Sequence, residues 1–443
     1  MNETRAPLRR VTNRGTSSRT PTRSWLAGVA WTACVATVSA QAPAFDRADD
    51  RDHVVRKNGK VESGRIHRPF DQKELLVLAN GRRTRVPRAD VERVETVADV
   101  VAEFLRRRQV RPAGAAASYD WILVEWAIAN RLPRLARLQA MEILFQDPDH
   151  VAARTLLGHR ASNAGWLWPV GDDGKQFVSL TELDARHSSF ARGHVLRSEH
   201  FQLQTDADLA TAVGVLFDLE TLHAEWIRRF GQRMNLSAIG APIDVHVHRD
   251  REAFPGRNRD RRPYYDPPGS GDIAYAWLGP GGDRRALLAV VVQPLLYRTL
   301  AETFTVDPQR RHVCTWVEIG LGSYVASLLD GPPGRMRVGI PKLPADERLT
   351  ALRGRAPDLK NLTHVPYARL FDTDEEALAA WGRMAAFVHF LMLPDRGHED
   401  AFLRFVVAAF RDGKGDSSRE LDRALGTPVE RLDPPFLAWL HSG

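Results

Sequence analysis

The chain has 443 residues, of which 43% are hydrophobic and 26% are charged, and its formal net charge is +7. This apolar content is sufficient for two or three packed domains and excludes a wholly disordered chain. Two cysteines are too few for a disulfide-stapled scaffold.

Residues 1–42 have the order of a secretory signal peptide. They contain six arginines and one glutamate, followed by an apolar stretch at residues 25–38 and by the small residues Ala40 and Ala42 at A-x-A-like cleavage sites. The apolar stretch of about 14 residues is shorter than the roughly 20 needed to span a bilayer. We therefore expect an exported protein, periplasmic or extracellular, without an integral membrane segment after cleavage.

Cleavage after residue 42 would also remove most of the positive charge. Residues 1–42 contribute +5, which leaves about +2 for the remainder. The remainder has no Lys/Arg-rich run interleaved with aromatic residues, so we expect no nucleic-acid partner. Cys314 would be the one cysteine left, and we expect it to be a buried free thiol.

Residues 46–96 are predicted to form a small SH3-like β module. The turn pairs Asn58-Gly59 and Asn80-Gly81 separate short runs that favour β structure, at 61–66, 75–78 and 84–86. Such a module either binds a partner or acts as a spacer. The spacer is favoured because no aromatic groove is evident in the sequence.

Residues 97–168 are predicted to be a helical connector. Apolar residues recur three and four positions apart at 97–108 and from 119 to about 164. The part around Asp147-Pro148 resembles one tetratricopeptide-like hairpin, and a single repeat cannot close a solenoid. We expect it to pack against the next domain, with a polar loop running on to about residue 194.

Residues 195–443 are predicted to form an α+β domain with a helical C-terminal tail. A strand at 198–206, a long helix at 208–230 and a strand from 242 precede helices at 286–304 and 313–330, and further helical segments follow from 377. The expected fold class is therefore α+β: a small β-barrel-like module, a helical hairpin, and this larger domain.

The helix predicted at 313–330 carries a recognisable motif. Its residues match W-[LV]-x-E-G-[LA]-A-x-Y at Trp316, Val317, Gly320, Leu321 and Tyr324, with Gly322 in place of Ala. With the helix before it, this stretch resembles the peptidase MA-like (gluzincin) zinc metallopeptidases over roughly residues 199–441. The resemblance implies HExxH on the first helix, where two His bind zinc and the Glu is the base, and a third ligand, Glu, on the second.

The zinc ligands that this resemblance implies are missing. The HExxH positions fall on Gln293, Pro294, Leu295, Leu296 and Tyr297, and the third ligand position is Ile319. We therefore predict an inactive member with no catalytic residue and no cofactor, which binds or scaffolds an unknown protein or peptide through the old cleft. The expected cleft-lining residues are Gln293, Tyr297, Trp316, Glu318 and Tyr324.

The positions of three residues would test this alignment. Gln293, Tyr297 and Ile319 are expected to converge between two packed helices, because Gln293 and Tyr297 are four residues apart. Pro294 is compatible with the first helix only near its first turn.

Two other functions are left open. One is a zinc-dependent peptidase or other hydrolase with unusual ligands, drawn from Glu318, Glu302, His312 or the pair His246 and His248. That pair lies two residues apart on a predicted strand and so shares a face, which makes it a weak metal candidate. The other is an interaction protein that works through the N-terminal β and helical modules. The sequence leaves the oligomeric state open.

Overall fold

The structure is a computed structural model that describes residues 52–442 except 68, 112–116, 164, 171–174, 238, 256–261, 267–270, 304–313, 355–357, 367, 370–371, 373 and 413–416. The expected signal peptide lies outside the described residues. Within the described part of the chain, no helix combines the length and the apolar character needed to cross a membrane.

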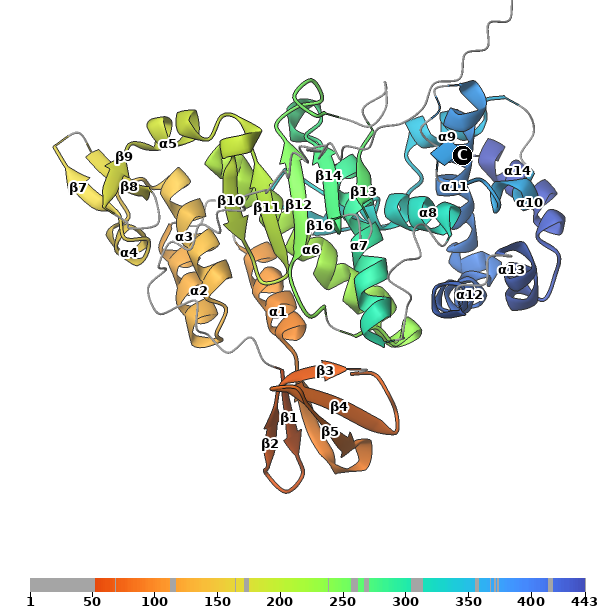
Figure 1. Cartoon of the computed structure of the whole chain (residues 1–443), viewed down its shortest axis with the longest axis horizontal. Coiled ribbons are helices and arrows are strands. Elements are labelled where there is room, and N and C mark those ends of the chain that lie inside the picture. Colours follow the sequence, from red (N-terminus) through yellow and green to blue (C-terminus); the bar gives the residue numbers. More distant parts are fainter. Residues whose placement is uncertain are drawn as a thin grey trace, which may run out of the picture. The chain divides into compact units, whose positions relative to one another are not determined.

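The N-terminal β module has two three-stranded antiparallel sheets and a small core of its own (Figure 1). Asn80 and Gly81 both have positive φ, as a tight hairpin turn requires. The first sheet has the order β2-β1-β6, with β1 (His53–Arg56), β2 (Val61–Ser63) and β6 (Val91–Glu95). The second consists of β3 (Arg65–His67), β4 (Glu74–Ala79) and β5 (Arg82–Pro87).

The helical connector is shorter than the sequence predicts. It comprises α1 (Val97–Gln109), α2 (Ala117–Ala129), α3 (Pro133–Gln146) and α4 (Val151–Leu156). The helix predicted to run to about residue 164 ends at Leu156, because Gly158 adopts φ +72°. Where the sequence predicts the end of the connector, the structure has β7 (Arg160–Ser162) and β8 (Gly165–Val170). The predicted polar loop contains β9 (Gln176–Val178) and α5 (Leu180–Arg186). Trp168 of β8 is buried and stacks on Phe145, which holds this small sheet against α3.

The central sheet of the larger domain has five strands in the order β10-β11-β12-β14-β13. Its strands are β10 (His194–Arg197), β11 (Phe201–Thr205), β12 (Ile243–His248), β13 (Tyr264–Asp266) and β14 (Ile273–Trp277). The pairs β11–β12 and β12–β14 are parallel, and the two outer pairs are antiparallel. Buried residues alternate with partly exposed ones along β11 and β12, so the helices cover one face of the sheet.

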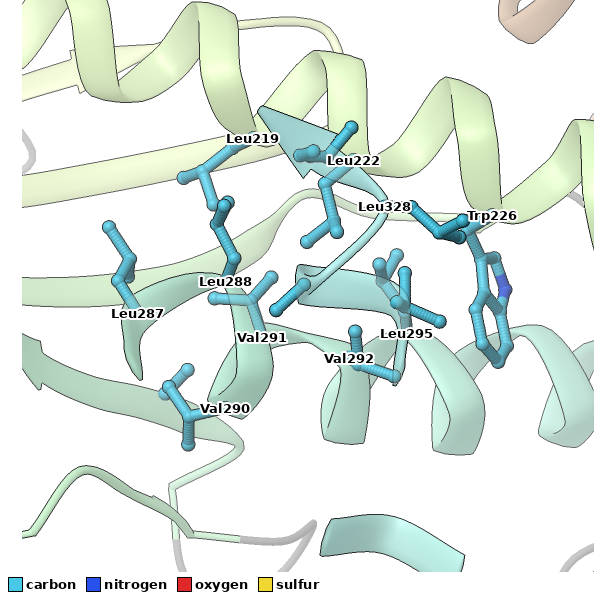
Figure 2. Close-up of a cluster of buried hydrophobic side chains, with 14 of the residues drawn as sticks. Leu219, Leu222, Trp226, Leu287, Leu288, Val290, Val291, Val292, Leu295 and Leu328 are labelled. Carbon is cyan, nitrogen blue, oxygen red and sulfur yellow. The ribbon is translucent and has the colours of Figure 1, made fainter. Parts of the chain in front are cut away.

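Two long helices provide that cover. α6 (Leu209–Met234) begins at Asp208, whose side chain accepts from the Thr211 N–H, and ends at Asn235 in the left-handed region. α6 contacts β10 and β11, whereas α7 (Arg285–Thr303) contacts β12, β13 and β14. Figure 2 shows leucine and valine side chains of α7 interleaved with Leu219, Leu222 and Trp226 of α6.

The C-terminal tail is helical, as predicted, and the fold as a whole is α+β. Its elements are α8 (Thr315–Ala326), β15 (Leu329–Asp330), β16 (Arg337–Val338), α9 (Ala345–Ala351), α10 (Leu359–Leu362), α11 (Glu375–Leu391), α12 (Glu399–Asp412), α13 (Ser417–Leu425) and α14 (Asp433–Ser442). One continuous apolar cluster joins α1 through α14. The helical connector therefore shares its core with the larger domain.

Candidate functional site

The motif helix α8 is wedged between α7 and α11 by two glycines. A Cβ at Gly322 would lie 2.5 Å from the Ala289 carbonyl oxygen on α7. A Cβ at Gly320 would lie 2.6 Å from the Met384 carbonyl oxygen on α11. Backbone atoms cannot move aside as a flexible side chain can, so these glycines set how closely the three helices approach.

A cavity of about 260 Å³ is lined by residues of α7, α8 and α9. Gln293 of α7 and Ile319 of α8 both line it, and each is almost fully buried. The Gln293 Oε1 atom has no hydrogen-bond partner among the described residues, which is costly for a buried polar atom. The other lining residues are Pro263, Trp277, Asp283, Arg285, Ala286, Ala289, Val290, Ser323, Ala326, Ser327, Pro344, Asp346, Glu347 and Trp381.

Tyr297 and Glu318, which were expected to line the cleft, lie in the core instead. The Tyr297 hydroxyl donates to Glu318 Oε1 at 2.8 Å, and the Cys314 backbone N–H donates to the same oxygen at 3.4 Å. Successive helix residues are rotated by about 100°, so Glu318 points away from the wall that Ile319 forms. Cys314 is the buried thiol that the sequence predicts, and burial raises its pKa.

Trp316 and Tyr324 are likewise not among the residues that line this cavity. The Trp316 ring packs among Phe387, Phe402 and Phe405, with ring centroids 5.3–5.7 Å away, and is a core residue. The Tyr324 hydroxyl accepts from Arg229 Nη1 at 2.6 Å. Tyr324 lines a separate groove of about 840 Å³. Of the five residues expected to line the cleft, Gln293 lies on the cavity wall.

Pro294 lies in the middle of α7, and the expectation that it must fall near the first turn is wrong. Proline has no N–H to offer the carbonyl four residues earlier, which belongs to Val290. Val290 is one of the residues that line the cavity. Extensive packing of α7 against α6 and α8 maintains the helix across this break.

The polar wall of the cavity comes from α9 and α8. The Ser323 hydroxyl donates to Glu347 Oε2, and His389 Nε2 of α11 lies 3.4 Å from the same hydroxyl. Burial raises the pKa of Glu347 to about 7, against 4.5 for an ordinary glutamate. Burial, with Arg348 nearby, lowers the pKa of His389 to about 3, so that ring is neutral.

The cavity entrance carries charged groups that pair with one another. Arg285 Nη2 lies 3.4 Å from Asp283, and its Nη1 lies 3.5 Å from Asp346. With Glu347, three carboxyl groups surround one arginine. The net charge of these four side chains is therefore negative. It becomes more negative above about pH 7, where Glu347 loses its proton.

The sequence interpretation missed Ser323 and Glu347. Pro344 followed by Asp346 and Glu347 is a usual helix start, with acidic residues in the first turn. That signal could have predicted α9, but not that Glu347 would reach Ser323 on another helix.

The alternative metal ligands are not brought together in the part of the chain that the structure describes. His246 and His248 of β12 both contact the Phe190 ring, at 5.3 and 4.1 Å between centroids. Burial lowers the pKa of His246 to about 4 and also lowers that of His248. Neither belongs to a group of three ligand side chains among the described residues. The Glu302 side chain and all of His312 lie outside those residues.

The raised pKa of Glu347 predicts a pH dependence of stability. Between about pH 4.5 and 7 the folded protein keeps a proton that the unfolded chain releases. The free energy of unfolding contributed by this group should therefore fall as the pH rises through that window, by at most about 1.4 kcal/mol per unit.

Glu347→Gln tests this because it cannot titrate and its carbonyl can still accept from Ser323. We expect urea denaturation at several pH values to show a flatter profile than the wild type between pH 4.5 and 7. Glu375→Gln, at an exposed glutamate in the first turn of α11, is the control. Identical slopes for Glu347→Gln and the wild type would contradict the prediction.

No family model matches the chain, and no curated protein matches it at a significant level. The resemblance to the gluzincins is therefore one of sequence motif, carried by the residues around Trp316 and by the helix before them.

Proposed function

We propose that this is an exported, peptidase-like protein that binds a peptide segment in the cavity between α7 and α8 without the zinc chemistry of the family it resembles. The observation that carries the proposal is the position of Gln293 and Ile319. They line one cavity from two adjacent helices, at the positions where the resemblance puts zinc ligands. An amide and an aliphatic side chain are not the usual ligands of zinc.

The chemistry of the cavity indicates what it would bind. Trp277, Trp381 and two prolines provide apolar surface, which suits the backbone and stems of an extended peptide. Glu347 at the wall and two aspartates at the entrance favour a positive charge. The occupant that fits this combination is a peptide segment with a lysine or arginine side chain.

The zinc hydrolase alternative has less support. Glu318 is committed to hydrogen bonds with Tyr297 and the Cys314 N–H, and it is completely buried. Using it as a ligand would require breaking both bonds and opening the core.

The N-terminal interaction hypothesis is weakened by packing. Phe104 of α1 stacks on Phe217 of α6, and Arg108 lies over the same ring. This surface is exposed only in an isolated N-terminal fragment. In the full chain, a partner that bound it would have to displace α6. The β module has a small core of its own, so packing does not argue against binding through that module.

Fluorescence binding of synthetic hexapeptides tests the proposal. Lysine-containing peptides should bind more tightly than matched peptides in which glutamate replaces lysine. Ser327→Trp would fill the cavity from its partly buried rim and should weaken binding at least about 10-fold, a loss of about 1.4 kcal/mol. Ile340→Trp, at an exposed residue of the separate groove, should leave it unchanged.

Two results would contradict the proposal. Equal affinity for lysine and glutamate peptides would refute the charge preference, and unchanged affinity in Ser327→Trp would place binding elsewhere. Mass spectrometry of the same mixtures would show intact peptides. Cleavage lost on replacing Glu318 by Gln would favour the hydrolase instead.

A further inference from the structure

A second group of polar side chains lies outside this cavity, between α6 and the start of β11. His200 immediately precedes β11, and Glu220 and His223 lie three residues apart on one side of α6. All three are buried, with exposed fractions of 6%, 0% and 1%. Their ligand atoms lie within 4.8 Å of one another, the one such group found in the described residues.

Two members of the group are already hydrogen-bonded to each other. His200 Nδ1 lies 2.7 Å from Glu220 Oε2, and the His200 backbone N–H donates to Oε1 at 2.8 Å. These bonds fix the carboxylate of α6 at the start of β11. They do not involve His223.

His223 is the unexplained member. Neither of its ring nitrogens has a hydrogen-bond partner among the residues that the structure describes. Its ring stacks on His200, with centroids 3.7 Å apart and planes inclined by 20°. Burial, and to a lesser degree His200, lowers the pKa of His223, so its ring is neutral and a nitrogen lone pair is free. Leaving two buried polar atoms unsatisfied costs a few kcal/mol.

The surroundings favour a cation. Burial lowers the pKa of His200, but the carboxylates of Glu220, Glu199 and Asp52 outweigh burial and raise it above its ordinary value. Glu199 is paired with Arg134 at 3.3 Å, and Asp52 accepts backbone N–H groups of Ile66 and Val97. Glu220 is therefore the carboxylate in direct contact with His200, and Glu199 and Asp52 have other partners.

We propose that His200, Glu220 and His223 form a structural binding site for a divalent transition metal, with Zn²⁺ the best match to two imidazoles and one carboxylate. This donor set is one that zinc uses in proteins. Ligand atoms around a shared zinc lie about 3.3–3.6 Å apart, given bonds of about 2.0–2.2 Å. The widest separation in the group must therefore shorten by up to about 1.2–1.5 Å, and one imidazole must rotate out of the stack.

The site is independent of the peptide cavity. Its ligands come from α6 and the segment before β11, whereas the cavity wall comes from α7, α8 and α9. The metal would tie α6 to the sheet, close to where Glu199 contacts α3 through Arg134 and the Leu135 N–H. We therefore expect metal to change stability and to leave peptide affinity unchanged.

The experiment uses the full chain, purified without a metal-affinity tag, stripped with EDTA and then titrated with Zn²⁺. Elemental analysis after dialysis should give about one zinc per chain, and the unfolding temperature should rise on adding Zn²⁺. Co²⁺ in place of Zn²⁺ should give visible absorption bands of a protein-ligated ion. His223→Gln and Glu220→Gln should each weaken binding at least about 100-fold, more than the loss of an outer-shell contact.

Matched controls separate this site from the others. His246→Gln and Gln293→Ala should retain stoichiometric zinc. No zinc uptake by the wild type, or uptake that survives in both His223→Gln and Glu220→Gln, would overturn the proposal. If Glu318→Gln lost zinc binding while His223→Gln kept it, the result would count against the proposed zinc-free cavity instead. The two proposals therefore fail in different ways. If His223→Gln does not fold, the wild-type titration alone decides whether a metal binds.

Discussion

Replacing Arg284 by Met is expected to lower the free energy of unfolding by about 3–5 kcal/mol, as breaking a buried ion pair does. Arg284 lies just before α7, is 3% exposed, and donates through Nη1 to Asp218 of α6. The same carboxylate accepts the backbone N–H groups of Gly334, at 2.7 Å, and Met336, at 3.3 Å. The pair thus joins α6, the start of α7 and the chain that leads to β16.

Removing the guanidinium leaves a carboxylate buried without its countercharge. Chemical denaturation measures the effect, and Arg285→Met provides the control because the neighbouring side chain is 52% exposed. Adding Asp218→Asn to Arg284→Met should recover part of the loss, since the uncharged amide can still accept one of the two backbone N–H groups through its single oxygen. Equal stability of Arg284→Met and Arg285→Met would show that the ion pair contributes little.

The fold class could be predicted because it depends on local patterns. The α6 pattern, with Asp208 at its start and apolar residues on one side, specifies a helix from nearby residues alone. The turn at Asn80 and Gly81 specifies a hairpin in the same way. The segment after Gly158 was misjudged because its strands are short and are stabilised by contacts of Trp168 with α3, which lies about 20 residues earlier in the chain.

The candidate site was harder to predict because it depends on how helices rotate against one another. The resemblance to the gluzincins implied that Gln293 and Ile319 lie close together on two helices, and both line the cavity. It could not show that Tyr297 would be held by Glu318, one residue from Ile319 but on another side of α8. That hydrogen bond depends on the crossing of α7 and α8.

The His200 group shows a related limit. Glu220 and His223 are three apart on a predicted helix, a spacing visible in the sequence. Their third member lies 20 residues earlier, at the start of a strand, and joins them through the packing of β11 against α6. Local spacing favoured His246 and His248 instead, which share a strand face but lie beside Phe190.

Gly320→Ala should destabilise the fold through the packing of α8 against α11. Alanine is intrinsically better in a helix by about 1 kcal/mol, which acts in the opposite direction. The added Cβ would overlap the Val388 side chain and would lie 2.6 Å from the Met384 carbonyl oxygen. Because the carbonyl belongs to a packed helix, relief requires moving α11, and we expect a net loss of about 1–3 kcal/mol.

Urea denaturation of Gly320→Ala, with Ser327→Ala at the end of the same helix as the control, measures this loss. Adding Val388→Ala removes one of the two obstructing groups and leaves the Met384 carbonyl in place, so it should rescue stability only in part. A variant as stable as the wild type would mean that α8 and α11 can separate at little cost. The cavity wall formed by Ile319 and Ser323 would then be less rigid than the proposed peptide site requires, because both residues sit on the helix that this packing holds in place.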